Sequence, residues 1–274
     1  MTDWPEVPEN VIEGVRERWP ERAEPWLASL GKTLADLCSE YNGQPRDTLH
    51  ARYGFVVSVD TPVGGLVIRS SPDPDGPIQA KVSEALAALE VAPAILRTFT
   101  TDLGTWTVMD EIKPGIPFAL TDRMAADLDA LAAPLIRLRQ QRAPAPEMPS
   151  LVTWLRSRLQ DDHLTDMPIW QQPATEAERQ AALARLAELE RDFEPRLCHG
   201  DASTWNLLLS GVNTWVLIDP RGLAGELAYD LAVLALKVRG QHTSDDVGRY
   251  FASIAEVSEE RVAAWMNIAV AARV

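Results

Sequence analysis

The most informative part of the chain is Leu197-Cys198-His199-Gly200-Asp201-Ala202-Ser203-Thr204-Trp205-Asn206, followed by Thr214-Trp215-Val216-Leu217-Ile218-Asp219-Pro220. Two short strands are predicted here, from Leu207 to Leu209 and from Trp215 to Ile218, with a glycine and an asparagine in the turn between them. A hairpin of this kind brings Asp219 back beside Asn206. We therefore expect Asp201, Asn206 and Asp219, which can bind metal or take a proton, to share one pocket.

The composition is that of a folded chain with an acidic surface. Its 274 residues suit one large or two modest domains, and 46% of them are hydrophobic, which is enough for a packed core. The formal net charge of -14 repels a phosphate backbone, so we expect no nucleic-acid partner. The same charge favours a cationic small-molecule substrate, although an acidic surface also serves solubility alone.

The sequence shows no signal for a membrane or for secretion. No apolar run is long enough to span a bilayer, and Met1–Asn10 is acidic and contains prolines. Cys38 and Cys198 have no metal-binding spacing and fit inert thiols in a reducing compartment. We therefore expect a cytoplasmic protein with no membrane partner, and its oligomeric state stays open.

The front of the chain predicts helices followed by an antiparallel sheet. A helical period places apolar residues on one face between Pro8 and Leu37, and from Gly54 the period changes to two. The predicted elements that follow are strands Gly54–Val59 and Leu66–Arg69, helix Gln79–Glu90, and strands Ala94–Phe99 and Thr105–Met109. Asp110–Gly115 then ends in proline and glycine, which is typical of a hinge.

The rear of the chain predicts helices. They span Asp122–Gln141, a segment that begins after Ser150 as N-cap, Thr175–Phe193, Tyr229–Val238, Ser244–Ala255 and Ser258–Ala272. The chain therefore predicts an α+β fold with two lobes, a small antiparallel-sheet lobe over residues 1–112 and a mostly helical lobe over residues 113–274. A cleft between two such lobes is the expected ligand site.

Asp201 and Asn206 have the spacing of a kinase catalytic loop. They are five positions apart, and in kinases the aspartate of such a pair accepts the proton of the substrate hydroxyl while the asparagine holds Mg²⁺. A second metal-binding carboxylate must then follow at a strand end, and Asp219 does. These residue types suit phosphoryl transfer because Mg²⁺ neutralises the phosphate oxygens and the base orients the attacking hydroxyl.

A family resemblance follows from these residues together with the sequence after them. His199-Gly200-Asp201 to Asn206, Leu217-Ile218-Asp219-Pro220-Arg221-Gly222 and Gly225-Glu226-Leu227-Ala228-Tyr229-Asp230-Leu231-Ala232 resemble the aminoglycoside phosphotransferase family, most of all its streptomycin and hydroxyurea kinase branch. The resemblance covers most of the chain from about Arg52 onward. It implies a protein-kinase-like bilobal fold, Mg²⁺, and ATP as phosphate donor, with GTP as the alternative.

The resemblance also implies roles for single residues. Asp201 becomes the catalytic base, and Asn206 and Asp219 become the Mg²⁺ ligands. His199 is expected to brace the loop, and Asp230 to support it from a nearby helix. Glu226, also in the family motif, is either a substrate ligand or a solvated surface residue.

The front part departs from the family pattern. Arg69 stands where the family usually has a lysine, and Glu84 is the candidate for its helix partner. An arginine there can still contact phosphate and a carboxylate, but its planar fork is longer and is not interchangeable with a compact ammonium, so the nucleotide pose stays open. Lys81 is either a surface partner of Glu84 or a substitute phosphate contact. The glycine-rich phosphate loop is incomplete.

Further candidate contacts lie in the hinge and in the aromatic residues. The backbone of Asp110, Glu111 and Ile112 is expected to meet adenine. Trp205 replaces the usual filler beside the base, and it either forms the floor of a sugar-ring site or packs the loop onto the hairpin. Trp154 and Trp170 are expected in the core, while Asp161 and Asp162 are either solvated or recognise amines.

The leading hypothesis is an ATP- and Mg²⁺-dependent phosphotransferase that acts on a hydroxyl of a small molecule, such as an aminoglycoside or an amino sugar. The alternative is a nucleotide-binding or sensing module without catalysis, motivated by Arg69 and the sparse glycines. A metallohydrolase site built on His199 and Asp201 is a third reading, weakened because the four histidines form no second metal-spaced pair. The acceptor itself, and whether its modification serves resistance or metabolism, stay open.

Overall fold

The computed structural model describes residues 4–121, 127–161, 164, 167, 171–238 and 242–274. By their contacts these residues form two compact units, one made of residues 1–80 and 93–111, the other of residues 81–92 and 112–274. The helix α3 (Gly76–Ala88) begins in the first unit and ends in the second. The predicted lobe boundary after residue 112 stays a prediction. The two units are described separately.

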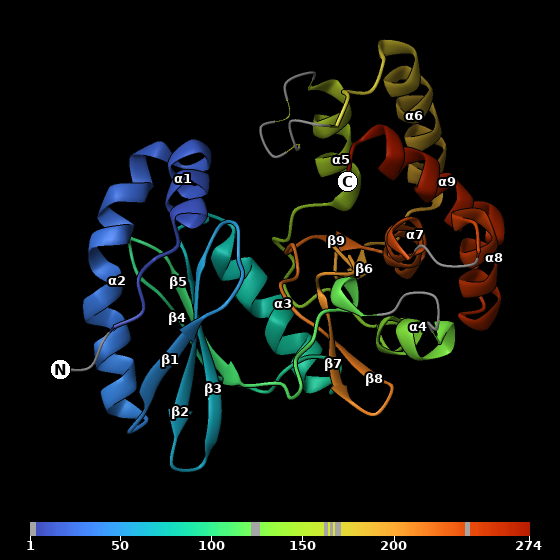
Figure 1. Cartoon of the computed structure of the whole chain (residues 1–274). Helices are drawn as coiled ribbons and strands as arrows, with labels where there is room; N and C mark the ends of the chain where they lie inside the picture. The colour runs from blue at the N-terminus through green and yellow to red at the C-terminus, as the bar shows by residue number, and fades with distance from the viewer. Residues whose placement is uncertain (1–3, 122–126, 162–163, 165–166, 168–170, 239–241) are drawn as a thin grey trace. The chain divides into compact units, whose positions relative to one another are not determined.

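The first unit is an antiparallel sheet covered by two helices. The five strands are β1 (Gln44–Thr48), β2 (Phe55–Thr61), β3 (Gly64–Ser71), β4 (Ile95–Thr100) and β5 (Thr105–Asp110), in the spatial order β1-β2-β3-β5-β4. The helices α1 (Glu9–Arg18) and α2 (Pro20–Glu40) lie against this sheet (Figure 1). Both predicted strand pairs and the two predicted helices are confirmed.

The core of the first unit joins helix and sheet. Buried side chains of α2, such as Trp26, belong to the same apolar cluster as Val57, Ile68 and Val108 of the sheet. The indole Nε1 of Trp26 donates a hydrogen bond of 2.9 Å to Ser70 Oγ, which satisfies the polar atom of a fully buried ring.

Strand β1 is not among the predicted elements. Its sequence, Gln-Pro-Arg-Asp-Thr, has no apolar alternation, and its side chains are exposed or half-buried. It is an edge strand that pairs only with β2 in this sheet, and polar residues and proline are typical of such edges. A hydrophobic-period argument cannot detect a strand of this kind.

The second unit is mostly helical. Its helices are α4 (Leu128–Ile136), α5 (Leu151–Gln160), α6 (Glu176–Leu189), α7 (Leu227–Lys237), α8 (Ser244–Ile254) and α9 (Glu259–Ala271), with the short 3₁₀ turns η1 (Phe118–Leu120) and η3 (Glu190–Asp192). Ser150 caps α5 as predicted, because its hydroxyl accepts a hydrogen bond from the Val152 amide. The part of the predicted Asp122–Gln141 helix before residue 127 lies outside the described residues.

Helix α7 is the centre of the second unit. All residues from Leu227 to Ala235 are buried, and α7 packs against both α8 and α9 (Figure 1). Two small strand pairs complete the unit, β6 (Arg196–Leu197) with β9 (Ala224–Gly225), and β7 (Leu207–Gly211) with β8 (Thr214–Leu217). The predicted α+β class, with an antiparallel sheet in the N-terminal part of the chain and helices in the C-terminal part, is confirmed.

In the described ranges, every helix is too short or too polar to cross a lipid bilayer.

Candidate active site

The HGD loop (residues 199–206) connects β6 to β7 and is anchored by a fully buried histidine. His199 Nε2 lies 2.8 Å from the carbonyl oxygen of Ile218, and His199 Nδ1 lies 3.3 Å from the amide nitrogen of Asp201. These partners fit one neutral tautomer, in which Nε2–H donates to the carbonyl and Nδ1 accepts from the amide. Burial lowers the pKa of His199, which keeps the ring neutral at physiological pH. These two contacts join the ring to the amide of Asp201 and to the residue before Asp219, and the bracing role of His199 stays a prediction.

Asp230 holds the start of the HGD loop from α7. Its two carboxylate oxygens accept hydrogen bonds from the amides of His199 and Gly200, at 2.7 and 2.8 Å. The side chain is fully buried. Burial raises the pKa of Asp230 to about 7, the two amide donors oppose the rise, and the charge of Asp201 adds to it. Asp230 thus fixes the loop without reaching solvent.

Gly200 allows the loop to turn sharply. Its φ of 79° is in the left-handed region, which glycine adopts without the cost that a Cβ brings. A Cβ at this position would also lie 3.1 Å from Cβ of Arg221. The glycine therefore permits close contact between the HGD loop and the segment that follows β8.

The candidate base, Asp201, remains accessible. Its side chain is 30% exposed, and its Oδ2 accepts a hydrogen bond of 3.1 Å from Nη2 of Arg221. The guanidinium carbon of Arg221 lies 4.7 Å from the ring centroid of Trp154 on α5. The sequence hypotheses placed Arg221 within the family motif without a role of its own.

The hairpin places the two candidate metal ligands at neighbouring strand ends. Leu207 pairs with Leu217, and the amide of Ile218 donates to the carbonyl of Asn206 at 3.0 Å, so Asp219 follows a residue bonded to Asn206. Asn206 Nδ2 donates to the backbone oxygen of Asp201 at 2.9 Å, which orients the amide group and directs its Oδ1 elsewhere. Asp219 is exposed and has a φ of 55°, a conformation that aspartate tolerates better than most residues.

The charged groups of the site gather around His199. Its pKa responds to the carboxylates of Asp201 and Asp219 and to the guanidinium of Arg221, which places all three within electrostatic range of one ring. Two carboxylates and a carboxamide oxygen are the hard oxygen donors that Mg²⁺ prefers. Among the described residues there is no cluster of three or more histidine, cysteine and acidic side chains suited to a metal.

Tyr229 is a second residue that the sequence did not single out. It is fully buried beside the site and packs edge-on against Trp265, with ring centroids 5.6 Å apart. Its hydroxyl has no hydrogen-bond partner within the described part of the chain. Burial raises the pKa of Tyr229, and the nearby guanidinium of Arg221 opposes the rise, so the phenol stays neutral.

The predicted nucleotide residues lie mainly in the first unit. Arg69 is half-buried on β3, and Asp110 ends β5. The amide of Asp110 donates to Ala94 and that of Glu111 donates to Gly65, both at 2.9 Å. Two of the three backbone amides that are expected to contact adenine are therefore already bonded to other backbone carbonyls. An adenine ring would need the Ile112 amide or the carbonyls of this segment.

The side chains near the hinge and on α3 have their own partners. The Glu111 carboxylate pairs with the guanidinium of Arg46 on β1. Lys81 Nζ lies 2.6 Å from Glu147, and both side chains are half exposed. Glu84 is exposed and belongs to the second unit while Arg69 belongs to the first, so their pairing stays a prediction.

The two candidate substrate residues differ in their surroundings. Trp205 is 47% exposed and stands directly before Asn206, two residues before β7 begins. Glu226 is only 15% exposed, and its Oε1 accepts hydrogen bonds from Arg261, at 2.7 Å, and from Trp265. A substrate role stays a prediction for both residues.

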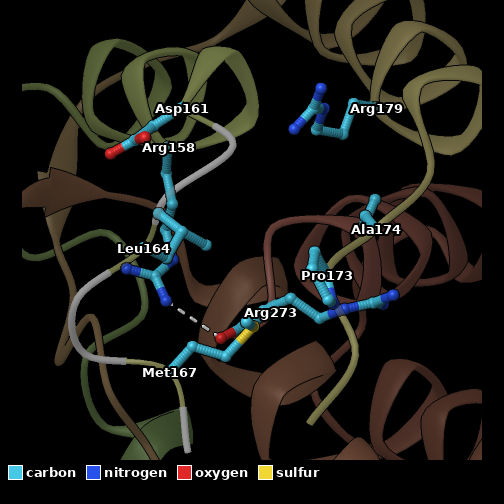
Figure 2. A pocket seen from close by; sticks show the side chains of 9 residues that line it. Arg158, Asp161, Leu164, Met167, Pro173, Ala174, Arg179 and Arg273 are labelled. Carbon is cyan, nitrogen blue, oxygen red and sulfur yellow. Dashed lines mark hydrogen bonds between the residues drawn. The ribbon is translucent and has the colours of Figure 1, made fainter. Parts of the chain in front are cut away.

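A small cavity lies between α5, α6 and the end of α9 (Figure 2). Its lining residues include Arg158, Asp161, Arg179 and Arg273. Its volume of about 10 Å³ holds roughly one water molecule, too little for an acceptor. Asp162 and Trp170, named above as candidates, lie outside the described residues.

Comparison with known families places this site in context. Residues 117–271, more than half of the chain and including the HGD loop and the hairpin, match the family described as "Aminoglycoside/hydroxyurea antibiotic resistance kinase". The chain belongs to this family. As a member of the aminoglycoside/hydroxyurea antibiotic resistance kinases it is a small-molecule kinase that phosphorylates hydroxyl groups. The predicted family and enzyme class are confirmed.

Solved structures of aminoglycoside phosphotransferases share the fold. APH(3'')-Id from Streptomyces rimosus ATCC10970, in complex with ADP and streptomycin, is 18% identical with a TM-score of 0.60 over 88% of this chain and 97% of that one. The type VIII aminoglycoside-3'-phosphotransferase is 21% identical with a TM-score of 0.60 over 87% and 97%. A thermostable mutant of APH(4)-Ia with ADP and hygromycin B is 17% identical with a TM-score of 0.58 over 85% and 87%. No curated protein matches the sequence.

Proposed function

We propose that this kinase transfers the γ-phosphoryl group of ATP, in the presence of Mg²⁺, to a hydroxyl group of a small amino-bearing or sugar-like molecule. The observation that carries the proposal is the arrangement of Asp201, Asn206 and Asp219 around one hairpin within the family match. Solved proteins of the same fold are complexed with ADP and with streptomycin or hygromycin B, which supports a nucleotide and an aminoglycoside-like acceptor. GTP is the alternative donor.

The residues of the hairpin fit a Mg²⁺ ion. Asn206 donates from Nδ2 to the loop backbone, so its Oδ1 is the atom oriented to act as a ligand, and the exposed Asp219 carboxylate supplies the second ligand. When bound, Mg²⁺ neutralises charge on the phosphate oxygens. The hairpin fixes the spacing of the two ligands, because Asn206 directly precedes Leu207 of β7 and Asp219 directly follows Ile218, whose amide donates to the Asn206 carbonyl.

Asp201 provides the base. The acceptor oxygen forms a bond to the γ-phosphorus as the bond from phosphorus to the ADP oxygen breaks, and the hydroxyl proton passes to the Asp201 carboxylate. Its half-exposed position on a loop fixed by His199 and Asp230 suits this role. Arg69 and Glu84 would orient the donor, while Trp205 offers a ring face to a sugar.

The test is a screen for ADP release over aminoglycosides, amino sugars and simple sugars, with ATP or GTP as donor. We expect ADP formation that depends on both Mg²⁺ and an acceptor. Asp201→Asn should lower this turnover by roughly 10³-fold or more because the hydroxyl loses its base and its orientation, while ATP binding stays. Asp102→Asn, the same change at an exposed turn residue of the first unit, is the matched control and should keep the turnover of the wild type.

Unchanged turnover in Asp201→Asn contradicts the proposal. The competing function is a nucleotide sensor without catalysis. Thermal stabilisation by ATP and Mg²⁺, with no phosphorylated product from the whole acceptor panel, would favour the sensor.

A further inference from the structure

Arg221 is held by its backbone and by an aromatic ring in addition to its contact with the candidate base. Its amide donates a hydrogen bond of 2.9 Å to the carbonyl of His199, and its Cβ faces the bare Cα of Gly200. Its guanidinium lies over the indole of Trp154, 4.7 Å from the ring centroid. A cation over an indole face is attracted by the ring quadrupole, so Trp154 directs the side chain. The arginine approaches Asp201 with little freedom left.

The contact with Asp201 is poorly suited to a purely stabilising role. Both side chains are 30% exposed, and ion pairs with this degree of exposure contribute little to folding free energy. The same contact has a clear geometric effect, because Nη2 of Arg221 engages Oδ2 of Asp201. The Oδ1 atom is then the carboxylate oxygen left to face an acceptor hydroxyl.

We propose that Arg221, held over Trp154, is a positioning residue that orients the Asp201 carboxylate toward the acceptor hydroxyl. This inference rests on the proposed function, since it assumes that Asp201 is the base. Arg221 acts through Asp201 and does not itself touch the reacting atoms.

An arginine suits this position better than a lysine or a methionine. Its planar fork stacks on an aromatic ring and at the same time donates to a carboxylate from its edge. A lysine at position 221 keeps the charge but offers a point-like ammonium that cannot do both. A methionine keeps an unbranched apolar stem and loses the charge and the donors.

The kinetic test compares Arg221→Met, Arg221→Lys and Trp154→Leu with the wild type, using an acceptor from the ADP-release screen. Because a misplaced base slows chemistry more than binding, kcat of Arg221→Met should fall about 10- to 100-fold. The KM values for ATP and acceptor should change by less than about threefold. Arg221→Lys should recover part of the loss, and Trp154→Leu should show a smaller loss that is not additive with Arg221→Met.

The matched control is Arg156→Met. Arg156 lies on the same helix as Trp154, and its guanidinium pairs with Glu190. Its kcat should equal that of the wild type. A kcat of Arg221→Met within about twofold of wild type overturns the inference, as does a rise in KM alone, which would make Arg221 a binding residue. Should Trp154→Leu fail to fold, Trp154→Phe replaces it and should lower kcat less.

A second measurement is independent of turnover. Crystal structures of the wild type and of Arg221→Met show directly whether the carboxylate keeps its orientation. We expect the Asp201 side chain to adopt a different rotamer once the guanidinium is gone. An unmoved carboxylate overturns the inference even when no acceptor is found, whereas absence of turnover in the wild type counts against the proposed function only.

Discussion

Asp230 shows how one buried side chain can fix the loop of the candidate site. Its carboxylate accepts the amides of His199 and Gly200, which are the two residues that lead into Asp201. Each of these amides would otherwise be a buried donor without a partner, and such a donor costs about 1–3 kcal/mol. The position of the candidate base therefore depends on an acid that lies on a different element.

Asp230→Asn should lower the free energy of unfolding by about 1–3 kcal/mol at pH 5, because the new NH₂ group faces one amide donor. The difference from the wild type should shrink as the pH rises from about 4 to about 7. Burial raises the folded pKa of Asp230 to about 7 from an ordinary 3.8, so its contribution is full below the ordinary value and is lost as the pH rises through the folded value. Urea denaturation at several pH values measures the effect.

The control for this experiment is Asp102→Asn at an exposed turn. His199 has the opposite pH dependence. Because its pKa is lowered in the folded state, its contribution to stability is present above its ordinary pKa and is lost on acidification. This contribution cancels in the comparison, since the wild type and Asp230→Asn both contain His199. A difference that widens with rising pH would show that the two amide donors outweigh burial.

At the level of elements, the β7–β8 hairpin is held on both sides by single segments of the second unit. Leu209 exchanges backbone hydrogen bonds of 2.9 and 3.0 Å with Ile116 and Gly115, and the Leu217 amide donates to the carbonyl of Val91 at 2.7 Å. The ring of Trp215 packs edge-on against Phe118. The hairpin is therefore a small sheet within its unit, with Asn206 and Asp219 at its open end.

Asn213→Ala should destabilise the protein by about 1 kcal/mol. Asn213 has a φ of 56° in the turn of this hairpin, and a residue with a plain Cβ pays more for that conformation than asparagine does. The change also removes the hydrogen bond of 2.6 Å from Asn213 to Asp127. Chemical denaturation measures the loss. Val212→Ala, at the 99% exposed neighbour, is the control, and an equal effect at both positions would contradict the turn argument.

At the scale of the whole molecule, many acidic side chains take part in exposed ion pairs, and a few belong to ion pairs that are partly buried. Most surface pairs, such as that of Lys81 with Glu147, contribute little. The contact of Glu226 with Arg261 is more enclosed, with side chains 15% and 20% exposed, and it joins the start of α7 to α9. It therefore ties the helix that carries Asp230 to one of its two packing neighbours.

Glu226→Gln should lower the free energy of unfolding by about 1–3 kcal/mol, since Arg261 loses a charged partner in a partly buried site. The KM for the acceptor should not change. Glu260→Gln, an exposed residue in the first turn of α9, is the matched control and should leave stability unaltered. Unchanged stability together with a raised acceptor KM would instead assign Glu226 to the substrate.

The sequence by itself determined the α+β class, the order of most elements and the spacing of Asp201, Asn206 and Asp219. These features depend on local patterns, because hydrophobic period and turn chemistry act between near neighbours along the chain. Edge strand β1 was missed since its polar residues carry no such pattern.

Only the tertiary structure decided which distant side chains meet at the site. The contact of Arg221 with Trp154 and Asp201, the two amides on Asp230 and the enclosure of Glu226 join residues from different elements. Such contacts depend on how helices pack around α7, and no spacing along the chain encodes that packing. The residue types of the candidate site therefore follow from the sequence, whereas the contacts that hold the candidate base do not.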